Sequence, residues 1–461
     1  MNYIDEQKIS DLLNQTKVPA TTQVKGILKK ALSLKGLSPE EVATLIGVSD
    51  ETLLEELWHT ARVVKQSIYG NRLVLFAPLY ITNYCVNNCL YCGFRRDNKN
   101  LKRKRLSREE LIEEVKALLS MGHKRLLLVF GEDPRGGIDD VCETIRTVYG
   151  VRLNGAAIRR INVNIAPLKK EEFAQLKKEG IGTYQLFQET YHYETYRTMH
   201  PEGPKSNYEW RITAFERAFQ AGIDDLGVGV LFGLYDWRFE ILAMLFYIQE
   251  LERRIGVGPH TISVPRVEPA LNAPVAANPP YAVGDRDFKK LVAILRLAVP
   301  YTGIILTTRE KSHLRNELFP LGVSQISAAS RTFPGAYRGG PVQKEESQQF
   351  HLGDTRSLEE VIEYVMKDGI LPSFCTACYR MGRTGVDFMS LAKPGLIQKF
   401  CLPNAILTFK EYLEDYASDR VKALGEKVIE RQIEEISDVH LEKEVLGRLK
   451  EIEHGKRDIY F

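Results

Sequence analysis

The chain has 461 residues, of which 44% are hydrophobic, and its 63 Lys and Arg against 60 Asp and Glu leave a formal net charge of +3. A chain of this length can bury a large core, and a charge so close to balance gives no reason to expect a nucleic acid or a membrane as partner. No stretch has the roughly 20 apolar residues of a membrane span, and the polar start MNYIDE does not resemble a targeting signal. We therefore expect a cytoplasmic protein, and in that reducing compartment its 7 cysteines should be metal ligands or free thiols rather than disulfides.

Residues 1 to about 70 have the spacing of amphipathic helices. The clearest helix start is at Ser38, where Pro39 suits the first helical position and Glu41 completes a capping box with Ser38. We expect a helical N-terminal extension over residues 1–72.

Between residues 73 and 330, eight short apolar runs alternate with longer amphipathic segments. The predicted strands are Pro78–Thr82, Arg125–Phe130, Ile161–Ile165, Thr183–Phe187, Asp225–Val230, Thr261–Val264, Gly303–Leu306 and Gln325–Ala328. The predicted helices between them include Ser107–Ser120, Lys169–Lys178, Asn207–Ala221, Trp237–Arg254 and Asp285–Ala298. This alternation favours an α/β fold with a closed parallel (β/α)8 barrel of the TIM type, although a doubly wound open sheet has the same periodicity.

After Ser327 the alternation is lost. Residues 331–403 are rich in Gly, Pro and Cys, with helical spacing only in Ser357–Lys367, and a charged helical segment runs from Thr408 to about Glu453. Residues 331–461 are too many for a simple cap on the barrel, so we expect them to form a helix-rich C-terminal extension.

The first predicted strand is followed by Cys85, Cys89 and Cys92, in the spacing C-x3-C-x2-C. Three thiolates can hold three irons of a 4Fe-4S cluster and leave the fourth iron open. The position also suits a reaction centre, because barrels build active sites at the carboxyl ends of their strands. A zinc site or three unliganded thiols are the alternatives, although zinc sites more often show C-x2-C pairs with a fourth ligand nearby.

With the aromatic Tyr91 directly before Cys92, this motif resembles the radical S-adenosylmethionine (SAM) superfamily. The resemblance implies that the open iron chelates the methionine part of SAM, and that one electron from the cluster releases a 5′-deoxyadenosyl radical. The SAM contacts that it implies are Tyr91, Gly131, Glu132, Asn164, Glu189 and Arg211. Phe130 stands where the superfamily often has the first Gly of a Gly-Gly-Glu stretch, and an acid or Arg near a strand end also has ordinary structural roles.

A second motif, Cys375, Cys378 and Cys401 in the spacing C-x2-C-x22-C, lies in the C-terminal extension. Structural zinc sites and electron-transfer clusters usually have four protein ligands, so three thiols predict a second 4Fe-4S cluster with an open iron. We therefore expect residues 331–461 to be an auxiliary cluster domain. Cys142 stands alone on a helical stretch, where a buried small hydrophobe is expected.

With both motifs, the chain resembles over nearly its full length the tyrosine-cleaving maturases of FeFe-hydrogenases. This resemblance implies cleavage of L-tyrosine to p-cresol and dehydroglycine, which decomposes at the second cluster to carbon monoxide and cyanide. A labile fifth iron, bridged to that cluster by a free cysteine, would trap both as a unit for the hydrogenase H-cluster. The implied partners are a ferredoxin- or flavodoxin-type reductant and other hydrogenase maturases. Two clusters at opposite ends of a barrel would also require small or polar residues inside it.

Four further residues are implied in binding. His260 opens the sixth predicted strand, so it should lie at the bottom of the barrel as a ligand of the fifth iron, although a lone His more often caps or lies at the surface. Arg309 follows the seventh strand and suits a bidentate clamp on the tyrosine carboxylate. Ser327 and Tyr80 correspond to pocket positions of related lyases. A salt bridge, a strand-end hydrogen bond and core packing are the respective structural alternatives.

Three other functions remain open from the sequence. The first is the tyrosine lyase of thiamine thiazole synthesis (2-iminoacetate synthase), which shares the barrel but lacks the C-terminal motif. The second is a different radical enzyme, and the third is a non-enzymatic iron–sulfur or zinc scaffold or carrier.

Overall fold

The computed structural model describes residues 3–339 and 345–461. The N-terminal extension is helical as predicted and contains α1 (Glu6–Gln15), α2 (Thr21–Ala31), α3 (Pro39–Ile46) and α4 (Glu51–Tyr69). The capping box at the start of α3 is confirmed, since the Ser38 side chain accepts from the Glu41 backbone and Glu41 accepts from the Ser38 backbone. Helix α4 packs against two helices of the central domain, α12 (Asp285–Ala298) and α13 (Ser312–Leu321).

The predicted closed barrel is confirmed. Strands β1 to β8 are all parallel and each pairs with the next, while β1 pairs with both β2 and β8 and so closes the ring. The barrel strands are β1 (Arg72–Thr82), β2 (Arg125–Phe130), β3 (Arg160–Asn164), β4 (Tyr184–Gln185), β5 (Leu226–Gly229), β6 (Thr261–Ser263), β7 (Gly303–Leu306) and β8 (Gln325–Ser327). Their apolar residues form part of one large core.

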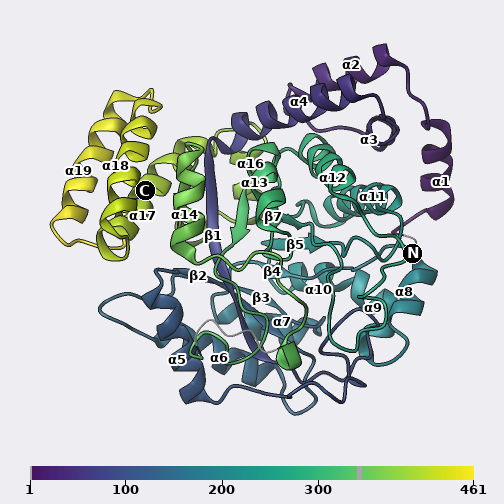
Figure 1. Cartoon of the computed structure of the whole chain (residues 1–461), viewed down its shortest axis with the longest axis horizontal. Helices are drawn as coiled ribbons and strands as arrows, with labels where there is room; N and C mark the ends of the chain where they lie inside the picture. The colour runs from purple at the N-terminus through teal and green to yellow at the C-terminus, as the bar shows by residue number, and fades with distance from the viewer. Residues whose placement is uncertain (1–2, 340–344) are drawn as a thin grey trace.

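Helices surround the barrel (Figure 1). They are α5 (Arg108–Ser120), α6 (Ile138–Gly150), α7 (Lys170–Lys178), α8 (Tyr193–Met199), α9 (Tyr208–Ile212), α10 (Ala214–Gln220), α11 (Trp237–Ile255), α12 (Asp285–Ala298) and α13 (Ser312–Leu321), with a 3-10 turn, η1 (Pro204–Ser206). The predicted helix Asn207–Ala221 is divided into α9 and α10 at Thr213. Cys142, on α6, is only 4% exposed, which confirms the prediction of a buried small side chain.

The C-terminal extension adds a ninth strand below the barrel. It contains η2 (Glu345–Ser347), α14 (Leu358–Lys367), β9 (Leu371–Ser373), α15 (Ala377–Arg380), α16 (Gly385–Ala392), α17 (Gln398–Asp415), α18 (Asp419–Glu434) and α19 (Val439–Glu453). Val74 of β1 pairs with Gln325 of β8 on one edge and with Ser373 of β9 on the other. Strand β9 therefore pairs with the same edge of β1 as β2 does, but nearer to the amino end of β1. This pairing also explains why β1 begins at Arg72 rather than at Pro78, where the sequence predicted it.

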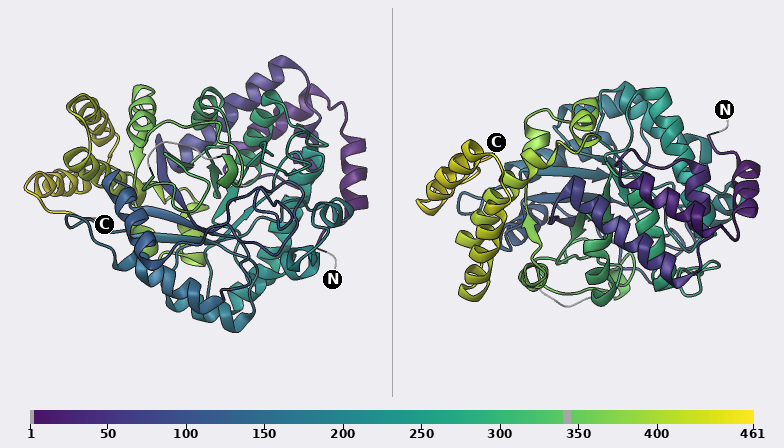
Figure 2. Two further views of the ribbon diagram at one scale, coloured as in Figure 1. Left: turned by 60° about the horizontal axis from the view of Figure 1, so that its bottom comes forward. Right: turned by 90° about the horizontal axis from the view of Figure 1, so that it is seen from above.

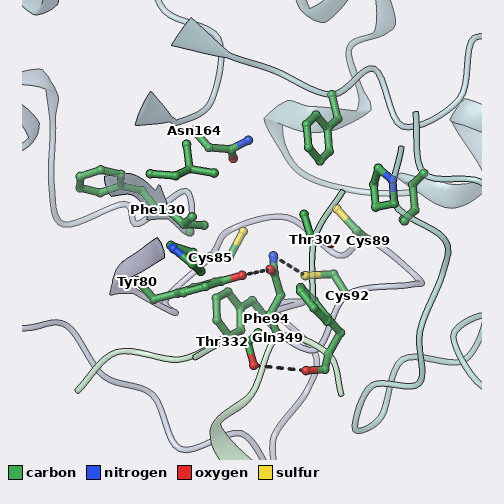
Figure 3. A pocket seen from close by; sticks show the side chains of 18 of the residues that line it. Tyr80, Cys85, Cys89, Cys92, Phe94, Phe130, Asn164, Thr307, Thr332 and Gln349 are labelled. Atoms are coloured by element: carbon green, nitrogen blue, oxygen red, sulfur yellow. Dashed lines mark hydrogen bonds between the residues drawn. The ribbon is translucent and has the colours of Figure 1, made fainter. Parts of the chain in front are cut away.

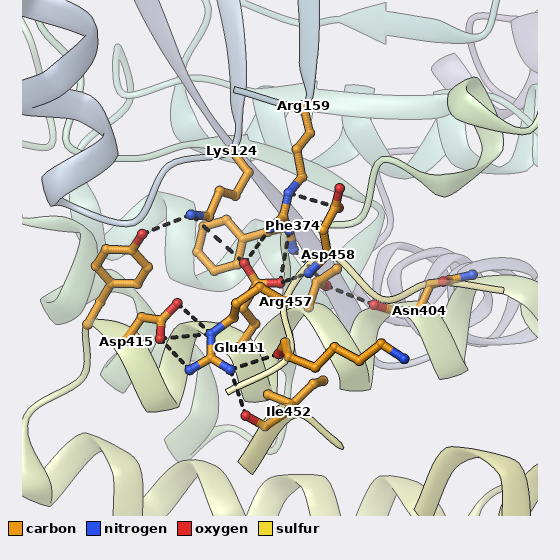
Figure 4. A network of polar contacts seen from close by, with 12 residues as sticks. Lys124, Arg159, Phe374, Asn404, Glu411, Asp415, Ile452, Arg457 and Asp458 are labelled. Carbon is orange, nitrogen blue, oxygen red and sulfur yellow. Dashed lines mark hydrogen bonds and ion pairs between the residues drawn. The ribbon is translucent and has the colours of Figure 1, made fainter. Parts of the chain in front are cut away.

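Helices α17 to α19 stand at one side of the molecule, opposite α1 in all three views (Figures 1 and 2). A polar network joins them to the barrel (Figure 4). Arg159, just before β3, forms ion pairs of 2.5 Å with Glu411 on α17 and 2.9 Å with Asp458 near the C-terminus. Arg159 and Glu411 are nearly buried, so this pairing is protected from water and anchors α17 to the barrel.

None of the helices in the described part of the chain combines the length and apolar character that a bilayer crossing requires. The division of the chain at residues 72/73 and 330/331 stays a prediction.

Candidate functional site

Two cavities lie at opposite ends of one barrel interior. On β8, Ser327 lines one cavity and Gln325, two residues earlier, lines the other. On β1, Tyr80 lines the same cavity as Ser327, and Val74 lines the same cavity as Gln325. Because alternate residues of a strand point to the same face, both cavities face the inside of the barrel. The upper cavity lies at the carboxyl ends of the strands and the lower cavity at their amino ends. Gln325 and Ser327 are polar or small interior residues of the kind the sequence led us to expect.

The upper cavity brings together the whole set of residues that the sequence predicted for the first cluster, SAM and tyrosine. Figure 3 labels five of them, namely Tyr80, Cys85, Cys89, Cys92 and Asn164. Its lining includes Tyr80, Cys85, Cys89, Tyr91, Cys92, Gly131, Glu132, Asn164, Glu189, Arg211, Arg309 and Ser327. These residues come from loops that follow several different strands, and only closure of the barrel places them around one space.

The cysteines of the first motif are free thiols in the loop after β1. Asn87 Nδ2 donates to Cys85 Sγ at 3.6 Å, and Gln349 Nε2 donates to Cys92 Sγ at 3.7 Å. Burial raises the pKa of Cys89 to about 12, although the Lys205 charge opposes this effect. Amide donors aimed at sulfur suit thiolate ligands of a cluster.

No three His, Cys, Asp or Glu side chains of residues 3–339 and 345–461 converge closely enough to hold a single metal ion. Cys85, Cys89 and Cys92 line one cavity, and each thiolate can bind one iron of a 4Fe-4S cluster. The donor set of the upper cavity therefore fits a 4Fe-4S cluster.

Arg103 holds the cysteine loop in shape. Its guanidinium donates to the carbonyl oxygens of Asn83 at 2.6 Å, Phe94 at 2.8 Å and Arg95 at 2.6 Å. These carbonyls lie on both sides of the three cysteines along the chain. The loop ends are therefore tied together by one cation.

The residues predicted for SAM lie between the cysteines and β2 to β5. Gly131 follows β2 where a Cβ atom would lie 2.2 Å from the Tyr84 carbonyl oxygen, so only glycine fits there. Asn87 Nδ2 donates to Glu132 Oε2 at 2.6 Å. These contacts seat the end of β2 directly against the cysteine loop.

Glu189 forms the second acidic point of the upper cavity. It has a backbone φ of 73°, which is uncommon for a residue other than glycine and which tertiary contacts must stabilise. Its carboxylate pairs with Lys205 at 2.6 Å and with Arg211 at 3.7 Å. Burial alone would raise the pKa of Glu189, but these two cations hold it below the ordinary value. The group is therefore an anion at neutral pH.

The Tyr91 phenol is paired with the buried His200. Its hydroxyl group lies 2.7 Å from His200 Nε2, and His200 Nδ1 lies 2.7 Å from the Tyr196 carbonyl oxygen. The carbonyl accepts the Nδ1 proton, so Nε2 is the acceptor and the Tyr91 phenol donates. Contact with a ligand would then fall to the ring and backbone of Tyr91.

The residues predicted for tyrosine line the same cavity. The Arg309 guanidinium carbon lies 3.3 Å from the centre of the Phe350 ring. Among the described residues no carboxylate lies within ion-pair distance of Arg309, which leaves its fork for an anionic ligand. The Tyr80 hydroxyl donates to Gln349 Oε1 at 2.8 Å, and Ser327 Oγ accepts from the Thr308 backbone at 3.1 Å.

The lower cavity collects Cys375, Cys378 and Cys401 with His260. Cys375 comes shortly after β9 and Cys401 lies near the start of α17, so β9 and α17 carry the second motif to the amino ends of the barrel strands. A hydrogen bond from Cys378 holds the pKa of Cys401 below its ordinary value, and the Arg72 charge acts in the same direction. This donor set also fits a thiolate-held cluster.

Arginines at the barrel floor surround the second motif. Arg72, Arg125 and Arg160 are the first residues of β1, β2 and β3, and all of them line the lower cavity. Arg160 pairs with Asp225 at 2.8 Å, whereas Arg125 donates to the carbonyl oxygen of Cys375 at 2.6 Å. A cavity lined by these cations favours anionic occupants.

His260 lies at the amino end of β6, where the sequence predicted it. Its Nδ1 is 3.8 Å from Asp225 Oδ2, and its ring centre is 4.1 Å from that of Phe388. Burial lowers the pKa of His260 to about 4, although Asp225 opposes the shift. The imidazole is therefore neutral at physiological pH, as a metal ligand must be.

Sequence reasoning missed several residues of both cavities. The arginines at the first positions of β2 and β3 could have been found, because a charge at the start of an otherwise apolar strand is unusual. No local signal marks the upper-cavity residues Asn87, Lys205 and Gln349, which only the paths of the loops place there.

The comparisons with known proteins agree with this geometry. Residues 79–246 match the Radical SAM superfamily, and residues 263–371 match the Biotin and Thiamin Synthesis associated domain. The first match covers the part of the barrel that carries the first cysteine motif.

Among curated proteins, 2-iminoacetate synthase of Escherichia coli (strain K12) is 30% identical over 347 residues, which are 75% of this chain and 89% of the relative. Among solved structures, a crystal structure of HydG, a maturase of the [FeFe]-hydrogenase, is 52% identical, covers 100% of both chains and has a TM-score of 0.96. The maturase HydG from Carboxydothermus hydrogenoformans is 44% identical over 96% of this chain and 97% of that one, with a TM-score of 0.83.

Proposed function

We propose that this chain, which belongs to the radical SAM superfamily and within it to the HydG maturases of FeFe-hydrogenase, is a tyrosine lyase that supplies an iron–carbonyl–cyanide unit for the hydrogenase H-cluster. L-Tyrosine is cleaved between Cα and Cβ to p-cresol and dehydroglycine. Dehydroglycine decomposes to carbon monoxide and cyanide, which a labile iron receives as cargo.

The observation that carries this proposal is the pair of cavities at opposite ends of one barrel, each lined by a cysteine triad. Cleavage of tyrosine and trapping of two diffusible poisons are different reactions. Placing them at the two ends of one barrel keeps the two reactions apart within a single protein.

In the upper cavity, Cys85, Cys89 and Cys92 hold the first 4Fe-4S cluster. A cluster held there would supply, from SAM, a 5′-deoxyadenosyl radical for hydrogen-atom abstraction from the substrate. Glu132 would accept a hydrogen bond from the amino group of SAM, and Glu189, Arg211 and Asn164 would hold its ribose and carboxylate. These residues would fix the position of SAM beside the cysteine triad.

On the substrate side of the upper cavity, Arg309 binds the tyrosine carboxylate through its planar fork. The stacked Phe350 ring holds that guanidinium in place without neutralising it. Ser327 and Tyr80 line the remaining wall and present polar groups to the amine or phenol.

In the lower cavity, Cys375, Cys378 and Cys401 hold a second 4Fe-4S cluster. The neutral imidazole of His260 would bind the fifth iron, which a free cysteine would link to the cluster. The floor arginines offset the negative charge of the thiolates, the bridging cysteine and cyanide.

We propose residues 331–461 as the auxiliary cluster domain beside the barrel of residues 73–330 and the extension of residues 1–72. The reductant is a carrier of the ferredoxin or flavodoxin type, other hydrogenase maturases receive the product, and the reaction takes place in the cytoplasm.

The alternative function is that of 2-iminoacetate synthase, to which the chain is also similar. It requires tyrosine cleavage but no second reaction centre. The cysteine triad and neutral imidazole of the lower cavity favour the maturase function.

The test is an anaerobic assay. The full chain is reconstituted with iron and sulfide, given dithionite, SAM, L-tyrosine and cysteine, and assayed for p-cresol and carbon monoxide together. The variant Cys375→Ala/Cys378→Ala removes the lower triad, and Cys142→Ala, outside both cavities, is the matched control.

We expect both products from the native chain and from the control, and p-cresol without carbon monoxide from the double variant. Formation of p-cresol alone by the native chain would support the 2-iminoacetate synthase function instead. Cleavage of SAM without consumption of tyrosine would indicate a radical enzyme that acts on another substrate. Absence of SAM cleavage would favour a non-enzymatic iron–sulfur scaffold or carrier.

A further inference from the structure

Gln349 connects two residues that act in different parts of the proposed reaction. Its Oε1 accepts a hydrogen bond of 2.8 Å from the Tyr80 hydroxyl, and its Nε2 donates to Cys92 Sγ at 3.7 Å (Figure 3). Tyr80 lies on the wall proposed for the substrate, whereas Cys92 is a proposed cluster ligand. One carboxamide therefore touches both the substrate side and the cluster side.

The orientation of this carboxamide follows from the chemistry of its neighbours. A cluster thiolate can only accept hydrogen bonds, so the amide nitrogen must face Cys92. The amide oxygen then faces Tyr80, which must donate. Burial raises the pKa of the Tyr80 phenol above its ordinary value, so the phenol keeps the proton that this arrangement needs.

The backbone around Gln349 is held on two sides. The Gln349 nitrogen donates to the Thr332 carbonyl oxygen at 3.0 Å, and the Gly93 nitrogen donates to the Gln349 carbonyl oxygen at 2.9 Å. A Cβ atom on Gly93 would lie 2.7 Å from that carbonyl oxygen, so glycine is required for this approach. The carboxamide is thus presented from a fixed base beside the residue that follows Cys92.

We propose that Gln349 is a positioning residue that couples occupancy of the tyrosine pocket to the reduction of the SAM cluster. The inference rests on the proposed function, since it places a cluster on Cys92 and L-tyrosine beside Tyr80. An N–H donor to a ligand sulfur stabilises the reduced cluster, which carries one more negative charge. A substrate that covers Tyr80 removes water from the Tyr80–Gln349–Cys92 chain, and hydrogen bonds strengthen when the local dielectric falls. Substrate binding thus makes the cluster easier to reduce.

The test measures cluster reduction directly, in the full chain that also carries Cys375→Ala and Cys378→Ala, so that one cluster gives the signal. The ratio of reduced to oxidised cluster is measured by electron paramagnetic resonance at a fixed solution potential. SAM is left out throughout, and each sample is measured with and without L-tyrosine. Gln349→Met removes both contacts, and Gln349→Glu keeps the acceptor for Tyr80 but loses the donor to sulfur. Tyr80→Phe removes only the phenol.

Thr332→Val is the matched control. The Thr332 hydroxyl donates to the Phe350 carbonyl oxygen at 3.2 Å, so the variant disturbs the same segment while it leaves the Gln349 carboxamide intact. We expect a ratio about fivefold lower in Gln349→Met than in the parent chain, as the typical net contribution of one hydrogen bond implies. Gln349→Glu should lower it further because it adds a negative charge. L-Tyrosine should raise the ratio in the parent chain and in Thr332→Val, but not in Gln349→Met or Tyr80→Phe.

The inference is overturned if Gln349→Met and Gln349→Glu keep the parent ratio, or if Thr332→Val lowers it as much as they do. If Gln349→Met does not load a cluster, Tyr80→Phe decides the matter, because it leaves the sulfur contact in place and must still abolish the response to L-tyrosine. The native chain is assayed for p-cresol in parallel. Tyrosine cleavage with an unchanged ratio in the variants means that this inference alone fails, whereas absence of cleavage means that the proposed function fails and the coupling with it.

Discussion

Arg125, the first residue of β2, donates a hydrogen bond of 2.6 Å to the carbonyl oxygen of Cys375. A residue of the barrel floor thus holds the backbone of the second cysteine motif. Together with the pairing of β9 on β1, this contact makes the C-terminal triad a continuation of the barrel rather than a separate attachment. The lower site depends on the barrel as closely as the upper site does.

We expect Arg125→Met to impair the lower site selectively. The change removes the hydrogen bond to Cys375 and a positive charge beside the thiolates, and a buried carbonyl left without its donor is costly, by about 1–3 kcal/mol. Carbon monoxide should fall about tenfold or more relative to p-cresol, a factor that corresponds to about 1.4 kcal/mol. The measurement is the ratio of the two products, with the iron content of each preparation.

Arg146→Met, on α6 and largely exposed, is the control for Arg125 and should leave the product ratio unchanged. A parallel loss of p-cresol and carbon monoxide in Arg125→Met would show instead that the barrel as a whole is damaged.

We expect Gly131→Ala to disrupt the upper site. The added methyl group would lie 2.2 Å from the Tyr84 carbonyl oxygen, and the Gly131 nitrogen already donates to the Thr82 carbonyl oxygen at 2.9 Å. Backbone atoms cannot move aside as a flexible side chain can, so the end of β2 must shift away from the cysteine loop. Iron content and SAM affinity should both fall, the latter about tenfold or more, as expected when overpacking costs roughly 1–3 kcal/mol.

Gly137→Ala provides the comparison, because a Cβ atom there meets nothing within 4 Å. It should load iron and bind SAM as the native chain does. Equal behaviour of the two variants would contradict a steric role for Gly131.

The barrel could be predicted from the sequence because each strand–helix unit is a local pattern. Two of the predicted strands, Arg125–Phe130 and Gly303–Leu306, have the observed bounds, and five others differ only at their ends. Strands β1 and β9 instead depend on a pairing between Val74 and Ser373, which lie far apart in the chain. The cysteine motifs were visible because ligand spacing is local as well. Gln349 could not be found in this way, since it lies 269 residues from Tyr80 and 257 residues from Cys92 in the sequence.

We expect stability to fall as the pH drops below about 6.5, in part because of His123. Burial lowers the pKa of His123 to about 3. Between the two pKa values the unfolded chain binds the proton and the folded chain does not, so stability is fully present above pH 6.5 and is lost as the pH decreases toward 3. One such group costs about 1.4 kcal/mol per pH unit inside this window.

His123→Leu should therefore reduce the difference in unfolding free energy between pH 7.5 and pH 5.5 by about 1.4 kcal/mol. Anaerobic urea unfolding of the reconstituted chain at both pH values measures it. His440→Gln, at an exposed position, should keep the native difference. The same pH dependence in His123→Leu as in the native chain would assign the acid sensitivity to other groups.

We expect Arg309→Gln to weaken the binding of L-tyrosine specifically. The Arg309 guanidinium stacks on Phe350 at 3.3 Å and lines the upper cavity, and no carboxylate of the described residues competes for its donors. A bidentate hydrogen-bonded pair with a charged ligand is worth roughly 1.5–3 kcal/mol, so KM for L-tyrosine should rise about 10- to 100-fold. For Arg309→Lys, KM for L-tyrosine should lie between the values of the native chain and Arg309→Gln, because an ammonium keeps the charge without the planar fork.

Steady-state formation of p-cresol at varied L-tyrosine and at varied SAM separates a binding role of Arg309 from a structural one. KM for SAM should stay close to its native value, and tyramine, which lacks the carboxylate, should bind the native chain and Arg309→Gln about equally. Lys311→Gln, two positions along the chain and exposed, is the control. If KM for SAM and KM for L-tyrosine rise together, or if Arg309→Gln still prefers L-tyrosine to tyramine as the native chain does, Arg309 does not bind the substrate carboxylate.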